Sequence, residues 1–144
     1  MSTRSRIALQ NNDGTFTSIY CHFDGYPSNN GKILLEHYTD ESKVRALMDL
    51  GDLSILGTEL GEKHDFDTHL DQNNTGCLAY GRDRGERNTE SVTSKTHAEL
   101  TDLTDNCGGE FLYLFANGAW SFKSLPYGEK PTKFRKLTQE ACQE

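Results

Sequence analysis

Residues 110–123 read Glu-Phe-Leu-Tyr-Leu-Phe-Ala-Asn-Gly-Ala-Trp-Ser-Phe-Lys and carry the strongest structural signal in the chain. Two β-prone runs flank the dipeptide Asn117-Gly118, which suits the two-residue turn of a β-hairpin. Trp120 and Phe122 alternate with polar residues in the second run, as in a strand that buries one face. The C-terminal part of the chain is therefore predicted to contain a hairpin.

A second hairpin is predicted near the N-terminus. The β-prone runs Arg6–Gln10 and Thr15–Phe23 are separated by the sequence Asn-Asn-Asp-Gly at 11–14. Glycine adopts a positive φ at little cost, so Asp13-Gly14 between such runs favours a tight reversal of the chain.

Helices are predicted between the hairpins. A short helix is expected over Ile33–Tyr38, where apolar residues share one side. A second helix is expected to begin after the capping residue Asp40, with Val44 and Leu47 on its apolar side. Gly51 stands where a glycine commonly ends a helix.

Weaker patterns predict the remaining elements. These are a single turn over 53–60, an inner strand over 77–80 followed by an extended segment over 81–86, a strand over 91–94, a short helix over 96–103, and a frayed helix or tail over 133–144. Two hairpins around two or three short helices indicate an α+β fold with an antiparallel sheet. We expect one globular domain over 1–144, with residues from about 130 onward as a candidate tail.

The composition disfavours several classes of protein. The chain has 144 residues, 34% of them hydrophobic and 26% charged, and a formal net charge of −7. No apolar run approaches the roughly 18 residues of a membrane span, and the N-terminus does not resemble a signal peptide. Direct nucleic-acid binding needs clustered cations, which the net charge of −7 disfavours. We expect a cytoplasmic protein that contacts neither membrane nor nucleic acid.

The cysteines point to no metal or redox motif. They stand at positions 21, 77, 107 and 142, so the chain contains no Cys-x-x-Cys pair. Two disulfides are formally possible, but a cytoplasmic protein is expected to keep all of its thiols reduced.

The densest cluster of chemically active side chains is Tyr-Cys-His-Phe-Asp-Gly-Tyr-Pro at 20–27. Alternation along a strand places Tyr20, His22 and Asp24 on one face and Cys21 on the other. His22 beside Asp24 suggests an oriented base or a ligand contact, whereas a nucleophilic Cys21 would need His22 on its own face. The alternative is that His22 and Asp24 bind the backbone of the following loop.

A second cluster combines acids with histidines. Asp65, Asp67, His69 and Asp71 line one face if the segment 64–71 is extended, and such a set can bind a divalent ion. The spacing matches neither an EF-hand nor the His-Glu-x-x-His helix, so a solvated acidic loop is the default and no metal site is assigned.

Arginines form the third cluster. Arg82 and Arg84 point the same way in an extended segment, and with Arg87 they offer guanidinium groups for phosphate or carboxylate. Arg4 and Arg6 alternate along the first strand and can join such a site. The alternatives are ion pairs of these arginines with neighbouring acids and a contact with a protein partner.

Several familiar reaction classes have no support. The chain contains no Gly-x-x-x-x-Gly-Lys-Ser/Thr, no Gly-x-Gly-x-x-Gly and no Gly-x-Ser-x-Gly sequence. We therefore assign no catalytic residue and no cofactor, and binding is preferred to catalysis.

Several segments resemble a family of small, mostly uncharacterised tailed-bacteriophage proteins. The similar segments are the opening Ser-Thr-Arg-Ser at 2–5 and the stretches 19–27, 34–38, 80–86 and 109–115. His22 to Pro27 is the most specific part, although Phe23 stands where such sequences often have Trp. The resemblance implies an accessory protein in the cytoplasm of an infected bacterium and brings no reaction with it.

Three functions fit these observations. The first is counter-defence by sequestering a nucleotide-like signal, with binding residues Arg82, Arg84, Arg87, Tyr26, His22, Asp24 and Arg4. The second is inhibition of a host defence protein, in which the acidic chain mimics nucleic acid. The third is a small metal-dependent nucleotide hydrolase. A homo-oligomer is also a reasonable expectation, because two hairpins leave edge strands.

Overall fold

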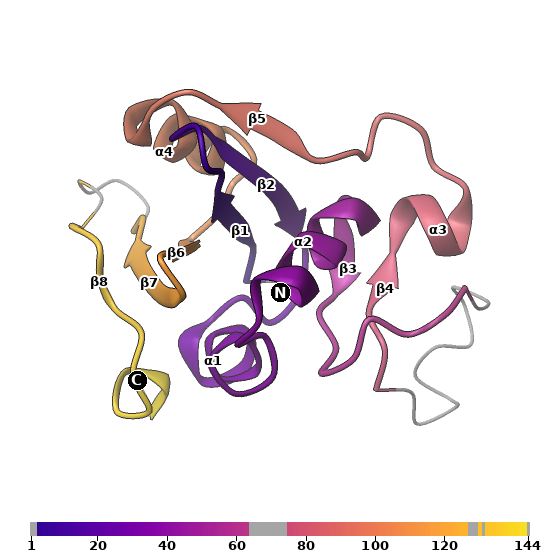
Figure 1. The fold of residues 1–144 in the computed structure, drawn as a ribbon, viewed down its shortest axis with the longest axis horizontal. Helices are drawn as coiled ribbons and strands as arrows, with labels where there is room; N and C mark the ends of the chain where they lie inside the picture. The colour runs from indigo at the N-terminus through magenta and orange to yellow at the C-terminus, as the bar shows by residue number, and fades with distance from the viewer. Residues whose placement is uncertain (1–2, 64–74, 127–129, 131, 144) are drawn as a thin grey trace.

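Both predicted hairpins are present in the computed structural model of the protein (Figure 1). β1 (Ser5–Gln10) and β2 (Phe16–Cys21) form the first, and β6 (Phe111–Ala116) and β7 (Ala119–Ser124) form the second. The structure describes residues 3–63, 75–126, 130 and 132–143.

The hairpins join through a parallel pair at the centre of the sheet. β1 lies parallel to β6, with Ile7 opposite Tyr113. β2 is likewise parallel to β3 (Leu53–Ile55), with Cys21 opposite Leu53. The α+β class is confirmed, but the sheet is mixed and not wholly antiparallel as expected.

Within the described ranges the sheet has eight strands, and it is not closed into a barrel. Its order is β4-β3-β2-β1-β6-β7-β8, and β5 pairs with the free half of β2. Among these strands, β4 is Leu78–Ala79, β5 is Val92–Ser94 and β8 is Arg135–Lys136.

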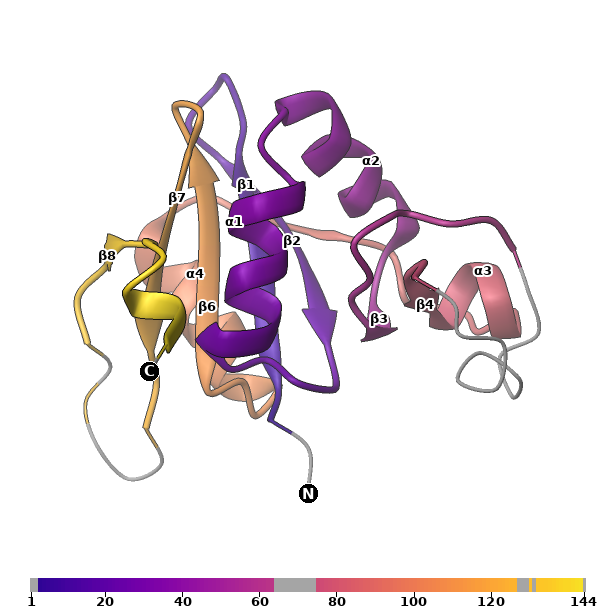
Figure 2. The same ribbon diagram turned by 90° about the horizontal axis from the view of Figure 1, so that it is seen from below.

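Helices cover both faces of the sheet (Figure 2). One face carries a helical turn, η1 (Pro27–Gly31), followed by α1 (Lys32–His37) and α2 (Glu41–Leu50). α4 (His97–Asn106) lies on the other face, and α3 (Tyr80–Arg84) stands beside β4. None of the helices in the described ranges is long and apolar enough to cross a membrane.

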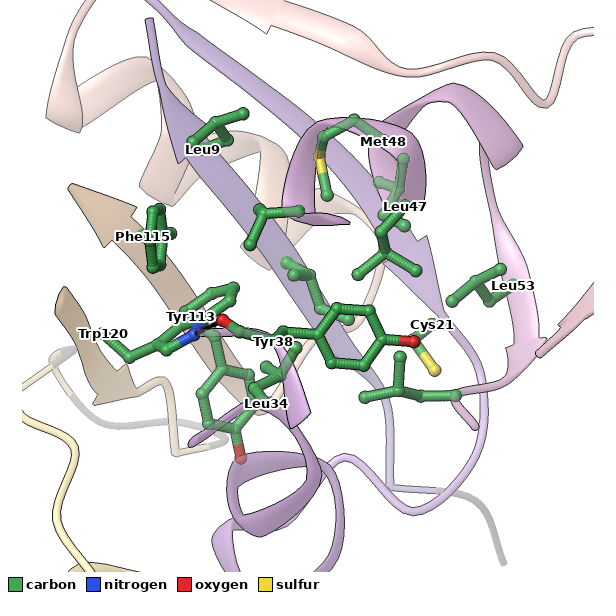
Figure 3. Close-up of a cluster of buried hydrophobic side chains, with 14 of the residues drawn as sticks. Leu9, Cys21, Leu34, Tyr38, Leu47, Met48, Leu53, Tyr113, Phe115 and Trp120 are labelled. Carbon is green, nitrogen blue, oxygen red and sulfur yellow. Dashed lines mark hydrogen bonds between the residues drawn. The ribbon is translucent and has the colours of Figure 1, made fainter. Parts of the chain in front are cut away.

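The larger part of the core lies under α1 and α2 (Figure 3). Tyr38 is fully buried there; its hydroxyl donates to the Gly57 carbonyl at 2.8 Å, and its own carbonyl accepts from Trp120 Nε1 at 2.9 Å. Burial raises the pKa of this phenol, so it stays a hydrogen-bond donor at neutral pH. These bonds tie the end of α1 to both halves of the sheet.

Three segments differ from the sequence prediction. Residues 53–55 form β3 instead of a turn, because the exposed edge of β2 supplies a partner strand. The segment expected to be extended after 80 is the helix α3. The expected tail contributes β8 and a final turn, η4 (Ala141–Gln143), and it buries Leu137 and Cys142 in the core.

Candidate functional site

The most distinctive polar cluster lies where β1 begins and β2 ends. In the hairpin register Arg6 stands opposite Tyr20, and alternation adds Arg4 and His22 on the same face of the sheet. We call Arg4, Arg6, Tyr20 and His22 the arginine face. It lies on the side covered by α4, because Arg6 shares a face with Ala8 of the core cluster under that helix.

Arg6 is a buried cation at the base of this face. Its side chain is only 4% exposed, and its Nε donates to the Ser18 hydroxyl at 2.8 Å. Burial lowers the pKa of its guanidinium, while Cys107 and Asp52 lie close enough to oppose that shift. In the described part of the chain, no carboxylate comes within ion-pair distance of Arg6 or Arg4.

Tyr20 and His22 form a short hydrogen-bonded pair on the arginine face. The Tyr20 hydroxyl and His22 Nδ1 are 2.6 Å apart. Burial raises the pKa of Tyr20 to about 12, so the phenol keeps its proton at neutral pH. Burial and the nearby Arg4 lower the pKa of His22, which keeps the imidazole neutral. When Tyr20 donates to Nδ1, the ring hydrogen sits on Nε2 as a second donor.

The loop after β2 presents two aromatic rings. Phe23 is 40% exposed and Tyr26 is 38% exposed, and the Phe23 ring centroid lies 4.5 Å from that of His22. The Tyr26 hydroxyl donates to Asp24 Oδ1 at 3.4 Å, and Asp24 adopts a left-handed backbone with φ of 57°. The amide of Gly25 donates to the carbonyl of Thr3 at 2.8 Å, which fixes the loop beside the N-terminal strand.

The fold places Arg4 near enough to His22 to lower the pKa of its ring, and Asp24 and Tyr26 form a hydrogen-bonded pair in the loop that follows. Four of the predicted binding residues therefore lie around the start of β1 and the end of β2. The His22–Asp24 pair considered as an oriented base is absent among the described contacts, because Nδ1 of His22 bonds to Tyr20. Cys21 points into the core as expected, and burial raises the pKa of its thiol to about 12. A nucleophilic Cys21 thiolate is thereby disfavoured.

Arg82 occupies a different position from the one predicted. In the helix α3 its guanidinium donates to Asp83 Oδ1 at 2.9 Å and to the carbonyls of Leu60 at 2.9 Å and Cys77 at 2.8 Å. Arg84 leaves the helix in another direction, pairs with Glu86 and lies 5.3 Å from the Tyr80 ring.

The expected parallel pair of arginines is therefore wrong. Arg82 is committed to the fold, so it has no free edge for a ligand. Arg84 and Arg87 are exposed on α3 and the loop after it. Their role in binding stays a prediction.

Tyr20 and Asp52 were not assigned to the site from sequence, and Arg6 was named only as able to join it. The placement of Arg6 and Tyr20 needs the hairpin register. Asp52, whose Oδ1 accepts the Tyr20 amide at 2.9 Å, gave no local signal because it reaches β2 from a distant loop.

The remaining candidate groups are the four thiols and the acidic cluster at 64–71. All four cysteines are free, as expected. No group of three metal-binding side chains occurs among the described residues. The candidate set Asp65, Asp67, His69 and Asp71 lies outside those residues.

A hollow of about 300 Å³ lies at the hairpin turns, at the opposite end of β1 from Arg4. Its lining residues are Gln10, Asn11, Asn12, Gly14, Glu41 and Asn117. This lining holds amides and one carboxylate but no cation, so it does not suit an anion.

Comparison with known proteins identifies no relative: no family model, no curated protein and no solved structure matches the chain. The likeness to phage proteins therefore remains a prediction from the sequence.

Proposed function

We propose that the protein binds a small anionic ligand of the nucleotide class at the arginine face and holds it without breaking a bond. The observation that carries this proposal is the pair of guanidinium groups at the start of β1, those of Arg4 and Arg6, neither of which forms an ion pair with a carboxylate in the described part of the chain. Arg4 is exposed and can contact a ligand, whereas the buried Arg6 adds positive charge behind it.

The neighbouring side chains fit the parts of a nucleotide. A guanidinium fork binds a phosphate through paired N–H donors, and the Nε2 hydrogen of neutral His22 adds another donor. The exposed rings of Phe23 and Tyr26 offer flat surfaces on which a base can stack. Phosphate at Arg4 and a base near Phe23 is therefore the arrangement that we favour.

Binding is preferred to catalysis because the chemistry of the face is poor in reactive groups. His22 is paired with a phenol that stays protonated, and no carboxylate orients its ring in the described contacts. Cys21 faces the core. These features favour sequestration over turnover.

The setting of this function is part of the same proposal. A phage accessory protein in the host cytoplasm would protect the phage by withdrawing a nucleotide signal of the host. The phage resemblance supports this setting, and the arginine face supports the class of ligand.

The test is thermal melting of the purified protein with cyclic nucleotides and ADP-ribose derivatives. A ligand at a hundred times its dissociation constant adds about 2.7 kcal/mol, which raises Tm by several degrees. We expect one compound to produce such a shift and to be recovered intact. Recovery of a cleaved compound would instead support the hydrolase hypothesis.

Substitutions then locate the site. Arg4→Glu is expected to weaken binding of the active compound at least about tenfold, because it removes charge-assisted hydrogen bonds. Lys32→Gln, in α1 on the opposite face of the sheet, is the control and should leave the affinity for the active compound unchanged. Loss of binding in Arg87→Gln but not in Arg4→Glu would place the site at the loop after α3. A panel without any shift would contradict the proposal and favour the host-protein inhibitor.

A further inference from the structure

We infer that the protein pairs with a second copy of itself through two oppositely charged strips on the α4 side of the sheet. The first strip, the lysine edge, consists of Lys123 and Lys136. The second, the acidic helix face, consists of Glu99, Asp102 and Asp105 of α4. This inference does not depend on the arginine face.

The strand register places the lysine edge beside α4. Lys123 stands opposite Leu112, and Leu112 belongs to the core cluster under that helix. Lys136 stands opposite Ser121, which in turn faces Leu114 of the same cluster. Residues paired across a sheet share a face, so both lysines project toward the side on which α4 lies.

An aromatic contact joins the two strips. The centroid of the Phe134 ring lies 5.6 Å from that of His97 at the start of α4. The Lys123 ammonium lies 4.9 Å from the Phe134 centroid. Burial lowers the pKa of Lys123, whose ammonium lies over the Phe134 ring. The lysine edge therefore runs next to the helix.

The acidic helix face points away from the core. Leu100 and Thr104 turn inward and are fully buried, whereas Glu99, Asp102 and Asp105 are exposed. Their spacing of three residues keeps them on the outer side of the helix.

The two strips do not neutralise each other within one copy. In the described part of the chain, none of these lysines or carboxylates has an ion-pair partner within 4.0 Å. Residues 121–137 hold five Lys or Arg and one Glu, a local charge of +4 in a chain whose total is −7. Among the described residues, the two strips of opposite sign thus lie on one side of the molecule without ion pairs, although the Glu99 carboxylate accepts a hydrogen bond from the Lys95 amide at 2.7 Å.

A two-fold axis between two copies of the chain would pair each strip with the strip of opposite charge on the other copy. It lays the lysine edge of one copy on the acidic helix face of the other and repeats the contact in reverse, as in an isologous dimer. A polyanion would meet the lysine edge but be repelled by the rest of an acidic chain. The matching negative strip, by contrast, is present on the same side of every copy. A second copy is therefore the favoured partner.

The first test is sedimentation velocity at several protein concentrations in 25 mM and 500 mM NaCl. We expect a dimer at low salt whose dissociation constant rises at least about tenfold at high salt, because exposed charges are screened. A wild-type chain that stays monomeric at low salt overturns the inference. If that monomer also binds a labelled oligonucleotide, the lysine edge serves a polyanion instead.

Charge reversal provides the matched test. Lys123→Glu/Lys136→Glu and Asp102→Lys/Asp105→Lys should each be monomeric alone, because each meets like charge in a second copy. An equimolar mixture of the two variants should form a heterodimer, which also shows that both are folded. Dimers that survive in either variant alone, or monomeric variants that keep wild-type melting curves but form no heterodimer when mixed, would contradict the proposed contact.

Discussion

Arg82 shows how one side chain can be diverted from a ligand to the fold. Its guanidinium binds a neighbouring carboxylate and three backbone carbonyls, those of Leu60, Gly61 and Cys77. The Asp83 side chain is fully buried, so it depends on this cation. Arg82 therefore joins α3 to the loop at 60–61.

Replacing this arginine tests that role. Arg82→Lys keeps the charge but loses the planar set of donors, and we expect it to lower the free energy of unfolding by about 3 kcal/mol in urea titrations. Arg87→Lys, on an exposed position, should change stability by less than about 0.5 kcal/mol. Equal effects of the two substitutions would show that Arg82 is not a structural residue.

The buried carboxyl of Asp52 should make the free energy of unfolding depend on pH. Burial raises the pKa of its carboxyl, and the Tyr20 amide and Arg6 only partly oppose that shift. A carboxyl whose pKa is higher in the folded state than in the unfolded state stabilises the fold most when the pH is below its pKa in the unfolded state. That contribution is lost as pH rises through the folded value.

The variant Asp52→Asn keeps an acceptor for the Tyr20 amide but does not titrate. Its stability relative to the wild type should therefore increase when urea titrations are moved from about pH 3.5 to pH 7. A difference that stays constant with pH would contradict the raised pKa.

At the scale of elements, the end of α2 depends on a close backbone contact. Gly51 has φ of 75°, and a Cβ placed on it would lie 2.2 Å from the Thr89 carbonyl oxygen. Gly14 in the first hairpin turn has φ of 86° but open space around it. Both glycines have a positive φ that an L-residue adopts only with strain, but only Gly51 also has a close backbone contact.

This difference gives a matched pair of substitutions. Gly14→Ala should cost about 1 kcal/mol of stability through φ alone. Gly51→Ala should cost more than about 3 kcal/mol, because the Thr89 segment must also move. Calorimetric Tm values for the two variants check this order, and similar losses would mean that the contact at Thr89 relaxes freely.

Elements marked by a turn or capping sequence could be predicted, whereas very short strands that form only by pairing with an edge strand could not. The hairpins carry Asp13-Gly14 and Asn117-Gly118, and α2 carries its cap at Asp40, whose side chain accepts from Ser42. β3 and β8 are three and two residues long and exist because an edge strand pairs with them. α3 was missed because Arg82 and Arg84 were expected in an extended segment, and no apolar periodicity marks a helix there.

For the whole molecule, the sequence located the candidate site only in part. It pointed to His22, Asp24, Tyr26 and Arg4 because they cluster at a strand end or alternate along one. It also pointed to Arg82, whose diversion into the fold depends on contacts with distant carbonyls. Burial of Arg6 and the approach of Asp52 follow from sheet register and loop packing, which no local pattern encodes.

The parallel pairing of β1 with β6 also determines when the protein can fold during its synthesis. Ser5–Leu9 of β1 pair with Phe111–Phe115, so the central strand lacks one neighbour until more than two-thirds of the chain has been made. At a synthesis rate of roughly 5–20 residues per second, that interval lasts on the order of ten seconds. The first hairpin emerges from the ribosome with an open edge, and completion of the sheet waits for the last third of the polypeptide.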